Sequence, residues 1–194
     1  MDARKRIMDY IDGKMWMVWV GLGGLVLSIA TIAIVVGVFL LFPSFYFLLR
    51  GVCTELPRHA NAKRCLDDLQ ARNLLVQAAT ELDNPQLVAC KNQASFTENF
   101  VFGRGVAMTY ADVKWTYKER RTYLFFITLA ENMYVCNIKG SRMVLINKGG
   151  KDKAEEIKAA MLKIYEKNPQ VLLGFGADRQ KAYNEMVRAA KQAK

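Results

Sequence analysis

The stretch MWMVWVGLGGLVLSIATIAIVVGVFLLFPSFYFLL occupies residues 15–49 and contains no charged side chain. An α-helix rises about 1.5 Å per residue and the bilayer core is about 30 Å thick, so about 20 apolar residues are enough to cross it. Two crossings would need about 40 residues and a turn, whereas Ala30–Ala33 contains neither glycine nor proline. The sequence therefore predicts one N-terminal transmembrane helix in a single-pass protein of the cell membrane.

The two ends of this apolar run favour the same interpretation. Trp16 and Trp19 lie at its start and several aromatic residues lie near its end, as is typical of rings at the two headgroup interfaces. Pro43 disfavours helical geometry at the residue before it, so we expect the helix to end near Phe42 and residues 44–49 to lie in the interface. The run is too long for a secretory signal peptide and lacks a clear cleavage site, which favours an uncleaved anchor.

Small residues in the run cluster on two helical faces. Gly21, Gly24 and Ser28 share one face, and Ala33 and Gly37 lie on roughly the opposite one. Small residues at this spacing let two helix backbones approach closely. Both faces are therefore candidate helix-packing sites, through which the chain would form a homo-oligomer or join a larger membrane complex.

The rest of the chain is basic. The protein carries a net charge of +10, and residues 50–194 contribute 24 Lys and Arg against 15 Asp and Glu. A basic domain beside a bilayer favours contact with anionic lipid headgroups, whereas ordinary solvated helix faces explain the same composition. Basic and acidic residues alternate along the predicted helices, so nucleic acid is not an expected partner. The positive-inside count ties at four basic residues on each flank, and the unpaired cysteines favour a cytoplasmic domain.

Four segments follow from this pattern. Residues 1–14 form a charged tail, residues 15–49 the anchor and interfacial segment, residues 50–93 a linker with an amphipathic helix, and residues 94–194 an α+β domain. Alternating apolar residues predict strands at 96–102, 106–110 and 113–117, then a hairpin of 123–129 and 134–138 with its turn at Glu131-Asn132. After a further strand at 143–146, helical periodicity predicts two C-terminal helices, the second beginning near Asp178.

Two segments of this domain carry a resemblance. SFTENFVFGRGVAMTYADVKWTY (Ser95–Tyr117) and YLFFITLAENMYVCNI (Tyr123–Ile138) resemble the strand series of bacterial pleckstrin-homology-like membrane proteins. The resemblance covers about 45 residues and extends loosely through the helix that follows. It implies a curved, nearly orthogonal antiparallel β-sandwich or partly open barrel capped by C-terminal helices, and it transfers no catalytic residue.

Domains of this kind often serve as interaction platforms, some of them through basic loops that bind lipid headgroups. The corresponding candidates are Arg104, in the turn Gly103-Arg104-Gly105, and Lys118, Arg120 and Arg121, which we expect at a hairpin tip. Ordinary solvated hairpin tips are the alternative interpretation, because a fold does not fix a function.

Catalytic and metal chemistry find little support in the sequence. The one histidine, His59, follows Arg58 and has no nearby carboxylate to orient it. The four cysteines include no C-x-x-C pair, so no metal or cofactor is expected. We therefore expect a membrane-anchored interaction, scaffold or regulatory module that is not an enzyme. An accessory subunit assembled through the apolar helix, an anionic-lipid-binding domain and a membrane-bound enzyme completed by a partner are the alternatives.

Overall fold

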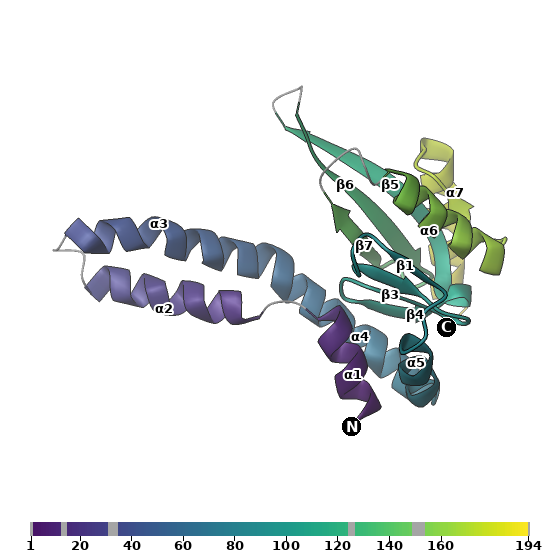
Figure 1. Ribbon diagram of the computed structural model, residues 1–194. Helices are drawn as coiled ribbons and strands as arrows, with labels where there is room; N and C mark the ends of the chain where they lie inside the picture. The colour runs from purple at the N-terminus through teal and green to yellow at the C-terminus, as the bar shows by residue number, and fades with distance from the viewer. Residues whose placement is uncertain (1, 13–14, 31–34, 124–126, 149–153, 194) are drawn as a thin grey trace. The chain divides into compact units, whose positions relative to one another are not determined.

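The computed structural model describes residues 2–12, 15–30, 35–123, 127–148 and 154–193. Two compact units are present: Met1–Ile11 with Ala62–Lys194 form unit 1, and Asp12–Asn61 form unit 2. The elements of each unit are drawn in Figure 1. The first eleven residues thus belong to the same unit as the domain that follows the apolar run.

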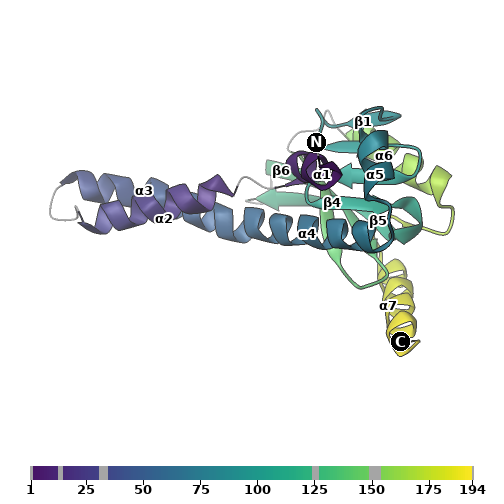
Figure 2. The same ribbon diagram turned by 90° about the horizontal axis from the view of Figure 1, so that it is seen from below.

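The apolar run of unit 2 forms two helices instead of one. Helix α2 spans Trp16–Ala30 and helix α3 spans Val35–Arg50, with 15 and 16 residues respectively. They lie side by side in opposite directions in both views (Figures 1 and 2). Across the described ranges, no helix is both long and apolar enough to traverse a bilayer. The predicted transmembrane helix and the predicted single-pass placement in the cell membrane are therefore wrong.

The helix was expected to end near Phe42, before Pro43, and this prediction is wrong. Pro43 lies inside the helix, which continues to Arg50. The next residue, Ser44, donates a hydrogen bond from its hydroxyl to the carbonyl of Leu40 at 2.7 Å, within the turn that contains the proline. Helical geometry continues through Pro43 even though proline has no amide to donate to the carbonyl four residues earlier, that of Phe39. A five-residue π-helix, Gly51–Glu55, then leads into α4, Leu56–Ala71.

Helix α1, Ala3–Ile11, is part of the core of unit 1. Ile7 and Ile11 are fully buried, and the Gly105 amide donates a hydrogen bond to the carbonyl of Ile11 at 2.7 Å. On the polar side of α1, Arg4 pairs with Asp67 and Arg6 pairs with Asp83. The residues predicted as a charged tail are thus an amphipathic helix. A single crossing at residues 15–49 would place α1 and residues 62–194 on opposite sides of a bilayer, which their shared core excludes.

Unit 1 contains two four-stranded sheets. The first has the order β1-β2-β3-β4 and is wholly antiparallel, and the second has the order β7-β6-β5-β8 with β8 parallel to β5. The strands span Leu87–Ala89 (β1), Ala94–Phe96 (β2), Phe100–Gly103 (β3), Val106–Thr109 (β4), Val113–Tyr123 (β5), Ile127–Asn137 (β6), Arg142–Lys148 (β7) and Leu172–Leu173 (β8). The α+β class predicted for this region agrees with this arrangement.

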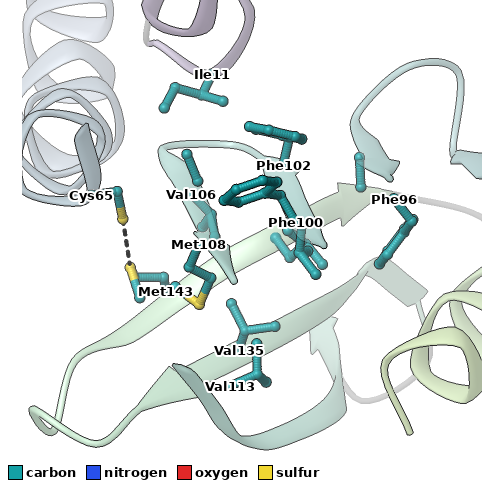
Figure 3. Packing of buried hydrophobic residues seen from close by; sticks show 14 of the residues in the cluster. Ile11, Cys65, Phe96, Phe100, Phe102, Val106, Met108, Val113, Val135 and Met143 are labelled. Carbon is teal, nitrogen blue, oxygen red and sulfur yellow. Dashed lines mark hydrogen bonds between the residues drawn. The ribbon is translucent and has the colours of Figure 1, made fainter. Parts of the chain in front are cut away.

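The main core lies between the two sheets. Figure 3 shows Phe100, Phe102 and Val106 of the first sheet above Val135 of the second, with Cys65 of α4 beside them. Burial of each large side chain stabilises the fold by about 1.5–3 kcal/mol. Helices α5, Leu75–Leu82, and α6, Ala154–Lys167, add further apolar residues to this core.

A second, aromatic cluster covers the other face of β5 and β6. It contains Trp115, Tyr117, Tyr134 and Tyr183, the last from α7, Ala177–Gln192. The guanidinium of Arg142 lies 3.9 Å from the ring centroid of Tyr134, a cation–π contact. Burial raises the pKa of Tyr117 to about 12.

The predicted turn at Glu131-Asn132 is wrong. Both residues lie within β6, and the chain between β5 and β6 includes residues 124–126, which fall outside the described residues. Their polarity predicts a solvated turn, but Glu131 and Asn132 are only 2% and 4% exposed. Sequence polarity indicates turns only where polar side chains are solvated.

Candidate functional site

Small residues form the seam between α2 and α3. A Cβ atom added at Gly21 would lie 2.5 Å from the backbone nitrogen of Leu48, and one added at Gly24 would collide with the hydroxyl of Ser44. Ser28 is fully buried and donates to the carbonyl of Gly24 at 2.7 Å. Three of the predicted helix-packing residues thus face the second helix of the same chain. Gly37 lies in α3, and Ala33 lies outside the described residues.

The outer surface of the hairpin is apolar. Trp19, Val26 and Ile29 of α2 are 69%, 61% and 59% exposed, and Phe42 of α3 is 73% exposed. Further exposed apolar side chains on these two helices are Trp16, Val20, Leu22, Leu27, Phe45, Tyr46 and Leu49. Because residues 15–49 contain no charge, neither helix has a polar face to turn toward water.

Aromatic residues gather at the open end of the hairpin, where α2 begins and α3 ends. The rings of Trp16 and Phe47 are 6.3 Å apart between centroids, and Tyr46 contacts Phe47 edge-on at 5.8 Å. Arg50 follows immediately and donates a hydrogen bond to the hydroxyl of Tyr46 at 3.1 Å. The hairpin is therefore aromatic and cationic at its open end, whereas the exposed residues Val26, Leu27 and Ile29, farther along α2, are aliphatic.

Polar contacts join the segments that precede α2 and follow α3 at the base of the hairpin. Asp12, which precedes α2, lies 2.8 Å through its Oδ1 from Nδ1 of His59 in α4. The half-buried His59 thus has a carboxylate partner 47 positions away along the chain, which the sequence could not reveal. Nearby, Arg58 pairs with the buried carboxylate of Glu55 at 3.5 Å.

The basic residues predicted to contact anionic lipid do not form one group at a hairpin tip. Lys118, Arg120 and Arg121 lie within β5, and Arg104 lies in the turn between β3 and β4. The buried carboxylate of Glu131 lies 3.7 Å from Nζ of Lys118 and 3.3 Å from Nε of Arg120. Two of the four cations are therefore already directed toward an internal carboxylate, and lipid contact through them stays a prediction.

A charged network surrounds Asp112 in unit 1. Arg72 donates two hydrogen bonds to the Asp112 carboxylate at 3.2 and 2.7 Å, and the Thr109 hydroxyl donates a third at 2.7 Å. Partial burial acts to raise the pKa of Asp112, but the hydrogen bonds from Arg72 and Thr109 outweigh it and the pKa is lowered. The network fixes the turn Tyr110–Asp112 against α4 and serves the fold.

This network predicts an acid-dependent stability. A carboxyl group with a lowered folded-state pKa stabilises the fold above its unfolded pKa, here 3.8, and loses that contribution as the pH falls below it. We expect Asp112→Asn to reduce the free energy of unfolding at pH 7 by about 1 kcal/mol. The deficit relative to the native chain should shrink below pH 3.8 in urea unfolding followed by circular dichroism. Glu185→Gln, on the exposed side of α7, is the control, and a pH-independent deficit would contradict the assignment.

The cysteines and the possible metal ligands of the chain do not form a reactive or metal site among the described residues. All four cysteines are free thiols: Cys53 is exposed, and Cys65, Cys90 and Cys136 are buried. Burial raises the pKa of Cys136 to about 12, and the side chain packs as a small apolar residue in the aromatic cluster. Within the part of the chain that the structure describes, no three His, Cys, Asp or Glu side chains come together as a metal site.

Comparison with known proteins gives no assignment. No family model, no curated protein and no solved structure matches this chain. The pleckstrin-homology-like resemblance of residues 95–138 thus stays a prediction.

Proposed function

We propose that this protein is a noncatalytic binding module held on a lipid bilayer by its helical hairpin. The observation that carries the proposal is the absence of charge from residues 15–49, together with the large apolar side chains exposed on both α2 and α3. In this arrangement the hairpin is buried in lipid as one antiparallel pair whose two ends emerge on the same side. Unit 1 then lies outside the lipid.

The distribution of residues along the hairpin supports a defined insertion direction. Tryptophan and tyrosine favour the headgroup region, and a cation favours the anionic surface. These residue types occur together at the open end, at Trp16, Tyr46 and Arg50. The closed end, approached by Ile29, carries only apolar and small residues in the sequence. The closed end therefore enters the lipid first.

A lipid environment fits this surface better than a second copy of the chain. A dimer of hairpins would cover one side of each pair and leave the remaining apolar side chains in water. Monomeric soluble proteins rarely expose such continuous apolar patches. Lipid covers every side at once, and burial of the exposed apolar area stabilises the bound state by about 25 cal/mol per Å².

Vesicle flotation of the full chain tests the proposal. We expect the native chain to float with phosphatidylcholine vesicles containing phosphatidylserine. A lysine at Val26 or Ile29 should weaken binding by roughly 100-fold, because a charge near the bilayer centre costs about 2.5–3.5 kcal/mol. Val76→Lys is the matched control: Val76 is 71% exposed, but it lies on α5 in unit 1. A native chain that stays with the vesicle-free fraction, or equal binding of Val26→Lys, would overturn the proposal.

A further inference from the structure

Among the described residues, one edge of the second sheet is paired with another strand over only a small part of its length. Strand β8 pairs with β5 only through Trp115↔Leu172 and Thr116↔Leu173. At Gly174 the backbone adopts φ +82° and leaves the sheet, and the Trp115 indole fixes this departure by donating to the Gly174 carbonyl at 2.8 Å. Strand β5 continues to Tyr123, so within the described residues its pairing on this side ends at Thr116.

The outward backbone groups of this edge follow from the pairing. The amide of Gly174 donates to the carbonyl of Thr116 at 2.9 Å, so Thr116 presents its backbone toward the β8 side. Backbone direction alternates along a strand, and the pairing of β5 with β6 is regular from Thr116 to Arg121. Lys118 and Arg120 therefore present their backbone amides and carbonyls to the open edge. Such groups are a ready template for another extended chain.

An apolar groove runs beside this edge. It has a volume of about 430 Å³ and lies between the end of β8 and α6. Its apolar walls include Leu173 and Phe175 on one side and Met161 and Leu162 of α6 on the other. Leu162 is 53% exposed and Phe175 is 67% exposed. The groove thus offers side-chain pockets next to backbone hydrogen-bonding groups.

Phe175 is exposed yet held in place. Its ring stacks on Trp115 at 6.1 Å with an interplanar angle of 15°, and lies 5.3 Å from the ring of Tyr117. Both partners are nearly fully buried. An exposed aromatic ring that is already held by buried neighbours loses little conformational entropy when a partner covers it. Aromatic residues of this kind are typical of binding hot spots.

The charges along the groove favour an acidic partner. Lys118 on β5 and Lys158 on α6 both line it, together with Glu155. Lys118 also faces Glu131, whose Oε2 has no hydrogen-bond partner among the described residues. Lys158 is exposed on the helix wall and can meet a carboxylate of the partner.

We propose that this groove binds an extended peptide segment of a partner protein, with alternating apolar and acidic residues, as an added strand on β5. A lipid tail would fill the apolar groove but leave the backbone groups of Lys118 and Arg120 unpaired, whereas a peptide backbone satisfies both. Alternate side chains of the peptide enter the groove beside Phe175 and Leu162, and an acidic residue between them faces Lys158. This site lies in unit 1 and does not depend on lipid binding by the hairpin.

Selection from random peptides tests the site. The full chain, kept in dodecylmaltoside micelles so that no bilayer is needed, is immobilised and screened against phage-displayed random decapeptides. We expect enrichment of sequences that alternate apolar and acidic residues. Methylation of every second backbone nitrogen of a selected peptide should abolish binding in one register only, and binding should slow hydrogen exchange at Lys118 and Arg120. Absence of enrichment, or equal binding in both methylated registers, would overturn the proposal.

Matched variants locate the peptide on the surface. Phe175→Ser should weaken binding roughly 30-fold, the loss typical of an aromatic hot spot. The control Val76→Ser changes an equally exposed apolar residue outside the groove and should leave binding unchanged. Lys158→Glu should weaken acidic peptides by roughly fivefold, whereas Lys181→Glu on α7 should not. Because each substitution is at an exposed residue, the fold is retained, and equal losses in variant and control would place the peptide elsewhere.

Discussion

Truncation of two isoleucines in the first helix is expected to unfold unit 1. Ile7 and Ile11 are fully buried in the main core, although they lie in a short basic segment before the apolar run. Replacing a buried isoleucine by alanine costs about 2–5 kcal/mol, and a domain of this size is stable by about 5–15 kcal/mol. The double variant Ile7→Ala with Ile11→Ala should therefore lose most of its stability. Chemical unfolding followed by the near-ultraviolet signal of Trp115 measures the effect.

A second substitution in the same helix provides the control. Lys5 is exposed on α1, so Lys5→Ala keeps the helix and removes no core contact. We expect its free energy of unfolding to lie within about 0.5 kcal/mol of the native value. If the double isoleucine variant unfolded at the native denaturant concentration, α1 would not belong to the core. The two ends of the apolar run would then not lead to one unit.

Separation of the two hairpin helices is the expected result of Gly21→Leu. The Cβ atom alone would lie 2.5 Å from the backbone nitrogen and 2.8 Å from the Cα of Leu48. A backbone cannot yield as a side chain can, so the helices must move apart. Gly23→Leu is a matched control two positions away, because a Cβ atom there meets nothing within 4 Å.

Spin labels report this separation directly. One label is attached to the exposed native Cys53 and the other to Val20→Cys, an exposed position on α2. The distance distribution of the native hairpin should be narrow, broaden and lengthen in Gly21→Leu, and stay narrow in Gly23→Leu. Unchanged distributions in both variants would show that the seam at Gly21 does not hold the helices together.

The sequence predicted the local properties of the apolar run but not its path. The sequence predicts that Gly21, Gly24 and Ser28 form a helix-packing face, but it places the partner helix on another chain. Its partners, Leu48 and Ser44, lie on the same chain after a reversal that no glycine or proline marks. The length of the run predicts one helix, because two spans would need about 40 residues, yet helices of 15 and 16 residues both fit within residues 15–50.

In unit 1 the α+β class and most strand positions could be predicted, because alternation of apolar residues is a local signal. Helix α1 could not, since nine residues with three basic side chains give a weak apolar face without knowledge of the surface they cover. The groove beside β5 also escaped notice. It depends on where β8 leaves the sheet at Gly174, and that is a property of tertiary packing.

The hydrogen bond between Gly105 and Ile11 also sets an order of events during synthesis. Helix α1 leaves the ribosome before the hairpin, but the strands that bury Ile11 are made only after the whole hairpin. Contacts so distant in sequence form late and slowly. The hairpin must therefore form before α1 can pack against the strands of unit 1. Unit 1 can complete its core only when the hairpin has reversed the direction of the chain.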